Sequence, residues 1–282
     1  MKTGLILEGG AMRGLFTCGV MDVLMENGIT FDGGAGISAG AVFGCNYKSK
    51  QPGRPFRYNV NYCKDPRYGS IKSLIRTGDI FDADFCYREV PLILDPFDAK
   101  TFAENPMEFY VGATNIETGE CEYHLCSDGL EEDTLWMRAS ASIPLVSRPV
   151  LINGHYYLDG GIVDSIPYHF MESIGYDRNI VVLTQVRGYV KKKGKEAIAA
   201  NILMKKYPEL CKTMNIRHIR YNEQVKEIEN KEKEGSVLII CPPEPLGFSR
   251  ITKDRDKLNE AYQIGRKTAE ERIEDIKTFL KG

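Results

Sequence analysis

The chain has 282 residues, enough for one large domain or two modest ones, with a core that needs no disulfide or metal to hold it. Apolar residues make up 43% and charged residues 27%, and the formal net charge of −2 provides no positive field that would attract nucleic acid. No stretch approaches the roughly 20 apolar residues of a membrane-spanning helix. The composition therefore argues against a nucleic-acid partner and against a transmembrane protein.

The N-terminal part of the chain is expected to alternate strands and helices. Leu5–Leu7 is a short apolar run cut off by Glu8, which fits a buried strand and not an export signal. Apolar residues then recur at helical spacing over residues 15–28, where an Asn-Gly pair ends the helix. Residues 29–37 are predicted as a second strand and 39–47 as a second helix. This order predicts an α/β fold with a mostly parallel central sheet flanked by helices.

The middle of the chain has weaker periodicity. Residues 49–106 are rich in proline and aromatic residues, so we expect loops and short helices there, and we expect this region to shape a substrate pocket. Two hairpins are predicted after it. The first joins residues 108–113 to 121–125, and the second joins 149–152 to 155–158 through an Asn-Gly turn.

The C-terminal part is expected to add two strands and a long helix, at residues 179–186, 236–241 and 254–280. Between the strands, residues 187–235 are heavily charged and helical, and we interpret them as an appendage or lid within a single domain of residues 1–282. The basic run 187–195 fits a solvated turn. The alternative is peripheral contact with anionic lipid headgroups, which attract such cations.

The eight cysteines are scattered, form no C-x-x-C pair, and in several cases lie among apolar residues, as free core thiols do. A disulfide framework is not expected in a chain of this length. We therefore predict a reducing, cytoplasmic location, with the inner face of a membrane as the site of any peripheral contact. No set of His, Cys and Asp residues has the spacing of a metal site, and neither a metal nor a cofactor is expected.

The most informative motif is Gly36-Ile37-Ser38-Ala39-Gly40, a G-x-S-x-G nucleophile elbow between an expected strand and an expected helix. A serine on such a sharp turn has strained backbone angles. The glycines two positions away on either side let the strand and the helix approach each other. The Ser38 hydroxyl would then be exposed above the sheet, ready to attack an acyl carbon.

The position of this elbow argues against the usual histidine-dependent triad. Ordinary α/β-hydrolases place several strands before the elbow and a histidine base after the acid, whereas only about one strand precedes Ser38. Of the four histidines, His124, His155, His169 and His218, only the last two follow Asp159. Neither of these two lies in a catalytic-loop context, so we interpret both as structural or surface residues. A dinucleotide fingerprint (G-x-G-x-x-A over 34–39) also matches formally, but no acidic residue closes a strand about 20 positions later.

A second glycine-rich loop precedes the elbow and contains Gly9, Gly10, Ala11, Arg13 and Gly14. Glycines allow close approach of backbone N–H groups to a ligand, and the helix that begins near Arg13 points its positive end at the same place. Preorganised N–H groups stabilise the oxyanion of acyl transfer. The alternative is a tight strand–helix turn that binds nothing. A phosphate-binding P-loop is excluded, because no Gly-Lys-Ser/Thr follows.

Three blocks in chain order resemble the patatin-like phospholipase family: the Gly9–Gly14 loop, the Gly36–Gly40 elbow and Asp159-Gly160-Gly161. The small-residue stretch Ala139–Pro144 resembles a fourth block. These blocks span residues 4 to about 167, more than half of the chain, and their joint occurrence is far more specific than any one of them.

This resemblance implies a three-layer α/β fold and a Ser–Asp dyad, with Ser38 as nucleophile and Asp159 as its base. It also implies that the Gly9–Gly14 loop is the oxyanion hole and that acyl esters of lipids are cleaved without a metal or cofactor. Two residues depart from the family pattern. Ala11 replaces a glycine and would be strained at positive φ, and Ser165 lies near a position where the family often has asparagine.

The sequence thus predicts a serine acyl hydrolase of the lipase or phospholipase type. One alternative is a hydrolase-fold protein that binds a lipid or a partner with little turnover, suggested by Ala11 and the charged 187–235 segment. Another is a non-lipid esterase or thioesterase, which would use the same dyad and differ only in its pocket. The motifs carry no information on oligomeric state.

Overall fold

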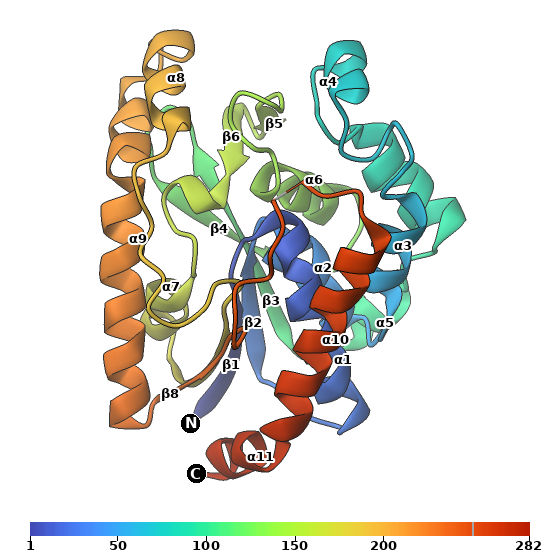
Figure 1. Cartoon of the computed structure of the whole chain (residues 1–282), viewed down its shortest axis with the longest axis vertical. Helices are drawn as coiled ribbons and strands as arrows, with labels where there is room; N and C mark the ends of the chain where they lie inside the picture. The colour runs from blue at the N-terminus through green and yellow to red at the C-terminus, as the bar shows by residue number, and fades with distance from the viewer. Residues whose placement is uncertain (250) are drawn as a thin grey trace.

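Eight strands form a single mixed sheet between two layers of helices in the computed structural model, which describes residues 1–249 and 251–282 (Figure 1). The strands are β1 (Lys2–Leu7), β2 (Gly33–Ile37), β3 (Glu108–Asn115), β4 (Cys121–Cys126), β5 (Val150–Ile152), β6 (His155–Asp159), β7 (Tyr176–Val182) and β8 (Val237–Ile240). The consecutive neighbours β8, β7, β1, β2 and β3 run parallel. The two predicted hairpins, β3–β4 and β5–β6, supply the antiparallel strands.

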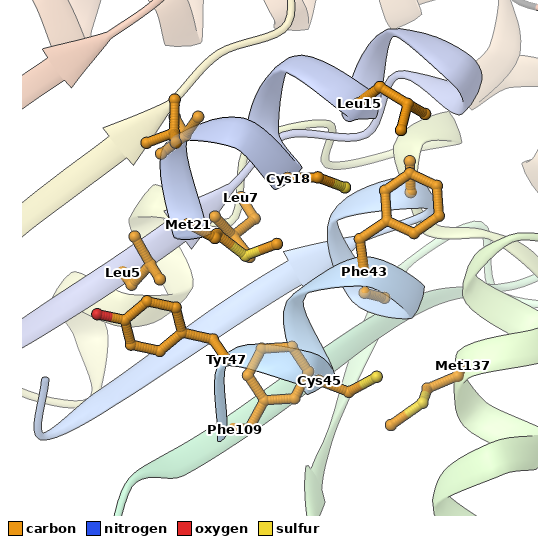
Figure 2. Close-up of a cluster of buried hydrophobic side chains, with 14 of the residues drawn as sticks. Leu5, Leu7, Leu15, Cys18, Met21, Phe43, Cys45, Tyr47, Phe109 and Met137 are labelled. Atoms are coloured by element: carbon orange, nitrogen blue, oxygen red, sulfur yellow. The ribbon is translucent and has the colours of Figure 1, made fainter. Parts of the chain in front are cut away.

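The sheet is buried on both faces, which confirms the predicted fold class. Along β1, Leu5 and Leu7 join one hydrophobic core, while Ile6 between them joins the other. Helices α1 (Gly14–Glu26), α2 (Ala39–Lys48) and α10 (Arg255–Glu271) cover the first core, and α7 (Tyr168–Ser173) and α9 (Pro208–Glu234) cover the second. Figure 2 shows side chains of α1 and α2 meeting over the sheet in the first core.

The C-terminal helix α10 packs directly on the N-terminal helix α1. A Cβ on Gly19 would lie 2.1 Å from the carbonyl oxygen of Tyr262, and one on Gly265 would lie 2.0 Å from that of Phe16. The two helix backbones are therefore in contact. The prediction of one helix over residues 254–280 is wrong, since a break at Arg272 separates α10 from α11 (Ile273–Lys281). The Arg272 guanidinium donates to the carbonyl of Ile239 instead of lying along a continuous helix.

The region 49–106 contains short helices joined by loops, as predicted: α3 (Arg54–Tyr62), α4 (Ile71–Thr77), the π-helix η2 (Phe85–Leu94) and α5 (Ala99–Glu104). Two strand boundaries differ from the prediction. Strand β2 covers only the last five residues of the segment 29–37. Strand β7 begins at Tyr176 and ends at Val182, because Thr184 leaves the sheet to donate its N–H to the carboxylate of Glu8.

The charged segment 187–235 forms α8 (Lys195–Leu203) and the whole of α9, both of which lie along one side of the sheet (Figure 1). The remaining elements are α6 (Glu131–Ser140) and two 3-10 turns, η1 (Ala11–Arg13) and η3 (Gly160–Ile162). Among the described residues, no helix combines the length and the apolar character needed to cross a membrane.

Candidate active site

The site lies where β2 and β6 meet end to end along β3. Strand β2 runs parallel to β3 and ends with Ile37 opposite Gly112. Strand β6 runs antiparallel to β3 and ends with Asp159 opposite the next residue, Ala113. Because β4 pairs with the other edge of β3 at Ala113, β2 and β6 share one edge. The residues that leave these two strands, Ser38 and Asp159, are therefore brought together by the register of the sheet.

Ser38 occupies the sharp turn that the elbow motif predicts. Its backbone has φ 55° and ψ −119°, a conformation that costs a non-glycine residue free energy. A Cβ on Gly36 would lie 2.3 Å from the carbonyl oxygen of Gly40, and one on Gly40 would lie 2.3 Å from that of Leu7. Only glycine fits at either position. The turn leaves the Ser38 side chain at the N-terminus of α2, with the residue 8% exposed.

Asp159 accepts a hydrogen bond from Ser38 across 121 residues of sequence. The distance from Ser38 Oγ to Asp159 Oδ2 is 2.7 Å, and both residues are buried. The N–H of Gly161 donates to the other carboxylate oxygen, Oδ1, at 2.8 Å. The hydroxyl of Thr114 donates to the Asp159 carbonyl at 2.9 Å. One carboxylate oxygen is thus held by the backbone while the other faces the serine.

The C-terminal end of α6 and the residues that follow it hold both residues in place. The N–H of Ser38 donates to Ser140 Oγ at 2.8 Å, and the N–H of Asp159 donates to the carbonyl of Ser142 at 2.8 Å. The sequence marked the Ala139–Pro144 block but did not indicate this role. The only sign of this role in the sequence is the run of small residues in the block. Small side chains let this segment approach the backbones of both Ser38 and Asp159.

The glycine loop lies beside the elbow, and a Cβ on Gly9 would lie 3.1 Å from that of Ser38. The Gly9 N–H donates to the carbonyl of Ser165 at 3.2 Å, so this amide is already used inside the protein. Among the described residues, no acceptor takes the N–H of Gly10 or Ala11. Ala11 has φ 49°, the strained left-handed region in which a glycine would cost about 1–2 kcal/mol less.

Arg13 and Gly14 anchor the far side of this loop. The Arg13 side chain donates to the carbonyl and hydroxyl oxygens of Thr184, at 3.3 and 3.4 Å. Gly14 begins α1, and a Cβ there would lie 2.8 Å from the ring of Phe43 on α2. The loop is therefore held both by the chain that follows β7 and by the helix that begins at the elbow.

Glu8 connects the loop to α9. Its carboxylate is 2% exposed and accepts from the N–H and hydroxyl of Thr184 and from the hydroxyl of Tyr221, the last at 2.8 Å. Burial, and then the nearby Glu8 carboxylate, raise the pKa of Tyr221 well above its ordinary value, so the phenol keeps the proton that it donates. The sequence indicates Glu8 only as the residue that ends the first apolar run, and it does not predict these buried contacts.

An apolar pocket of about 1000 Å³, counting its open mouth, has Ser38 and Ala11 in its wall. It follows α2 past Val42 to Cys45, roughly 10 Å at the helical rise of about 1.5 Å per residue. Much of the remaining wall comes from the region 49–106, including Tyr58, Tyr68, Phe81, Tyr87, Val90 and Phe97. The pocket has the volume and the apolar lining to take a hydrocarbon chain whose carbonyl lies at Ser38.

Two thiols line the same pocket, and both are poor nucleophiles. Burial raises the pKa of Cys45 to about 12, and it raises the pKa of Cys86 above the range in which a thiolate forms. A thiol must lose its proton to attack a carbonyl. Burial therefore keeps both thiols protonated at neutral pH.

Three histidines bind acidic side chains other than Asp159: His124 contacts Asp133, His155 contacts Glu117 and His169 contacts Glu227. Two groups could in principle hold a metal ion, namely His124, Cys126 and Asp133, and His169, Glu172 and Glu227. The first is already satisfied, because the Asp133 carboxylate also accepts from two backbone N–H groups. The second is largely solvent-exposed.

Replacing Gly160 by alanine should disrupt the meeting point of the strands. A Cβ there would lie 2.3 Å from the carbonyl oxygen of Gly112 and would push Asp159 away from Ser38. Because a displacement of about 1 Å can cost roughly 100-fold in rate, we expect kcat for a soluble ester to fall by at least that factor. Gly154→Ala is the matched control at the other end of β6. Nothing lies within 4 Å of its Cβ, and although an alanine at its φ of 88° costs about 1–2 kcal/mol of stability, this strain lies in the turn between β5 and β6, so kcat should stay within about threefold of wild type. Equal losses in both variants would contradict this prediction.

Comparison with known proteins identifies two matching families. Residues 5–171 match the family model described as patatin-like phospholipase. Residues 207–281, which contain α9, α10 and α11, match a domain of unknown function, DUF6363.

Among curated proteins, the chain is 27% identical to the uncharacterized protein YjjU of Escherichia coli, over 94% of this chain and 75% of that protein. It is 26% identical to lysophospholipase nte1 of Aspergillus niger, over 98% of this chain but only 18% of that much longer protein. Among solved structures, VipD from Legionella pneumophila aligns with 97% of this chain and 67% of its own, at 12% identity and a TM-score of 0.46.

Proposed function

Because the chain belongs to the patatin-like phospholipase family, we propose that it cleaves fatty-acyl esters of lipids with Ser38 as nucleophile and Asp159 as general base. The family supports lipid acyl hydrolysis in general. The 2.7 Å hydrogen bond from Ser38 Oγ to Asp159 carries the assignment of these two residues. A positioned base within hydrogen-bond reach of a hydroxyl is the arrangement that activates a serine.

In the first half of the reaction, Ser38 Oγ attacks the ester carbonyl carbon while Asp159 takes the hydroxyl proton. The carbonyl oxygen becomes an oxyanion, which we assign to the N–H groups of Gly10 and Ala11. Each such donor contributes about 10²–10³-fold to the rate. The tetrahedral intermediate collapses to an acyl-enzyme, and the leaving alcohol departs with the proton from Asp159. Water then attacks the acyl carbon and gives a proton to Asp159. The bond to Ser38 Oγ breaks, Asp159 returns the proton to Oγ, and the fatty acid leaves.

We propose a lipid with a single acyl chain, such as a lysophospholipid, as the preferred substrate. The pocket that contains Ser38 follows one helix and offers room for one chain. The Aspergillus niger relative is named a lysophospholipase, which points in the same direction. An esterase or thioesterase acting on short, water-soluble acyl groups would have no need of the apolar wall beyond Val42.

Val42→Phe tests this assignment, because Val42 lies one helical turn from Ser38 in the pocket wall. The larger ring should obstruct a long acyl chain and leave an acetyl group unaffected. We expect the kcat/KM for lysophosphatidylcholine to fall at least tenfold, about 1.4 kcal/mol, while hydrolysis of an acetyl ester changes less than threefold. Val42→Ala is the control and should retain both activities. Equal loss of both substrates in Val42→Phe would contradict a chain-binding role for the pocket.

We further propose that the whole chain functions as one domain, with α9, the long helix of the charged segment 187–235, as a structural support of the loop that begins at Glu8. The contact between Tyr221 and Glu8 supports this assignment, as does the close packing of α10 on α1. A reducing, cytoplasmic place of action remains a prediction from the cysteine pattern, and all eight cysteines are free in the structure.

A further inference from the structure

Helix α8 turns aliphatic side chains toward the solvent. Its inward face, Ala197 and Ala200, is buried, whereas Ile198 is 60% exposed, Ile202 66% and Leu203 71%. Scattered exposed apolar residues are ordinary on a protein surface, but three on the outer face of one short helix form a patch. A helix that carries exposed aliphatic side chains on its outer face is suited to lie against the interface of a lipid bilayer.

Lysines bracket this aliphatic patch at both ends of α8. Those that are exposed are Lys192, Lys193, Lys195, Lys205 and Lys206. The nearby acidic side chains are compensated within the protein, since Glu196 lies 3.8 Å from Arg217 and Glu209 lies 2.7 Å from Lys212. The surface around α8 is therefore positive, although the whole chain is slightly negative. A positive rim around an aliphatic centre complements an anionic bilayer, whose headgroups attract the lysines while its acyl chains accept the isoleucines.

Helix α4 offers a second aliphatic protrusion. Ile71 and Ile75 are 73% and 82% exposed and lie four residues apart, on one face of the helix, next to the exposed Lys72. The chain segments on either side of α4 carry Tyr68 and Phe81 to the wall of the Ser38 pocket. This helix therefore stands beside the pocket.

The two helices lie at the same end of the molecule. Figure 1 shows α8 and α4 as separate projections at the end opposite both chain termini, toward which β1 and β2 run. Ser38 follows β2 at that end. Ala197 and Ala200 of α8 pack in one cluster with Leu158 and Ile162, which flank Asp159. Both projections are thus joined to the site, one through the pocket wall and one through the chain around Asp159.

We propose that the outward faces of α4 and α8 form one docking surface for an anionic lipid bilayer, which places the Ser38 pocket against the lipid. This role presupposes the proposed lipid hydrolysis for its purpose, but the binding itself does not depend on catalysis. On docking, the exposed aliphatic side chains of both helices enter the interfacial region of the bilayer. The lysines around α8 are attracted to the anionic headgroups.

The test is co-sedimentation of the full chain with vesicles of phosphatidylcholine alone or with about 30% phosphatidylserine, at low salt. A Ser38→Ala background prevents consumption of the lipid. We expect binding to the anionic vesicles only. Replacing Lys192, Lys193 and Lys195 by glutamine should weaken it roughly 100-fold, at about fivefold per cation. Ile198→Ser with Ile202→Ser, and separately Ile71→Ser with Ile75→Ser, should each weaken binding at least tenfold.

The matched control replaces three lysines near the chain termini, Lys267, Lys277 and Lys281, by glutamine and should bind as wild type. All these variants, made with Ser38 intact, should hydrolyse a soluble acetyl ester at the wild-type rate, which shows that they are folded.

Equal vesicle binding by the two lysine variants would overturn the proposal, as would failure of the parent protein to bind anionic vesicles. It would also be overturned if the protein were a dimer that the Ile198 and Ile202 replacements dissociate. Absence of ester hydrolysis in the parent would instead refute the proposed function and leave the binding result standing.

Discussion

Replacing Ser38 by alanine is expected to abolish ester hydrolysis. Loss of the nucleophile costs a serine hydrolase about 10⁶-fold in kcat, because the acyl-enzyme cannot form and only substrate binding and oxyanion stabilisation remain. Within the described residues, the hydroxyl of Ser38 donates to the Asp159 carboxylate. Removing this hydroxyl therefore leaves no backbone group without a partner. The variant should therefore unfold at the wild-type temperature while its rate on an acetyl ester falls to background.

Ser49→Ala is the matched control, because Ser49 follows the last residue of α2 just as Ser38 precedes its first. Ser49 is buried and its hydroxyl contacts Asn46 and Gln51 at the far end of the helix. Its replacement should leave kcat within about twofold of wild type. Activity of Ser38→Ala at more than about one hundredth of the wild-type rate would assign the nucleophile to another residue.

Replacing Asp159 by asparagine is expected to lower kcat by about 10³–10⁴-fold. An amide cannot accept the proton of Ser38 Oγ, and loss of a general base typically costs up to about 10⁴-fold. Asparagine has nearly the same shape, so its side-chain oxygen can still accept from the N–H of Gly161. The loss should appear in kcat with little change in KM, since the carboxylate acts on the serine and not on the acyl chain.

Asp164→Asn is the control for this replacement. The Asp164 carboxylate is also buried, but it accepts from the hydroxyl of Tyr123 and from the side-chain amide of Gln224, and not from Ser38. Burial raises the pKa of this carboxyl group, which makes a neutral amide a modest change. We expect Asp164→Asn to keep at least a tenth of wild-type kcat. A similar loss in both variants would mean that a buried carboxylate is needed for folding at this place and not for proton transfer.

The parts of the site that could be read from the sequence are those encoded within a few residues. A serine between Gly36 and Gly40 predicts a turn too tight for any side chain at the flanking positions, and the structure shows this close approach. The strain anticipated at Ala11 is likewise a local property, and it is present as a positive φ. Asp159 was found through a block of residues and not through its distance from Ser38, which no local pattern encodes.

The contacts that hold the site together could not be predicted, because they join segments far apart in the chain. Ser140 lies 102 residues from the amide that donates to it, and Thr184 lies 176 residues from Glu8. Neither residue is distinguished by its neighbours, since serines at a helix end and threonines after a strand are common. The pairing of β1 with β7, which places Leu7 opposite Val182, explains why Glu8 and Thr184 meet, and the register of β2 and β6 on β3 explains why Ser38 and Asp159 meet.

The order of apolar segments along the chain predicted the fold class, but it did not predict the residues at which each helix and strand ends. The break between α10 and α11 occurs at Arg272, without a glycine or proline to signal it, because the arginine reaches a carbonyl on β8. The π-helix η2 has Pro91 inside it, a residue that sequence rules take as the end of a helix. In both cases tertiary contacts outweigh local preference.

The central claim is that Ser38 is a nucleophile activated by Asp159, and a fluorophosphonate probe tests it most directly because such a probe reacts only with an activated serine. We predict that intact protein is labelled at Ser38, as located by peptide mass spectrometry. Labelling should be at least 100-fold slower in Asp159→Asn and absent in Ser38→Ala, while Ser49→Ala and Asp164→Asn should label within tenfold of the wild-type rate. Failure of the wild-type protein to react would favour a binding protein with little turnover. Labelling at another serine, or at an undiminished rate in Asp159→Asn, would contradict the dyad.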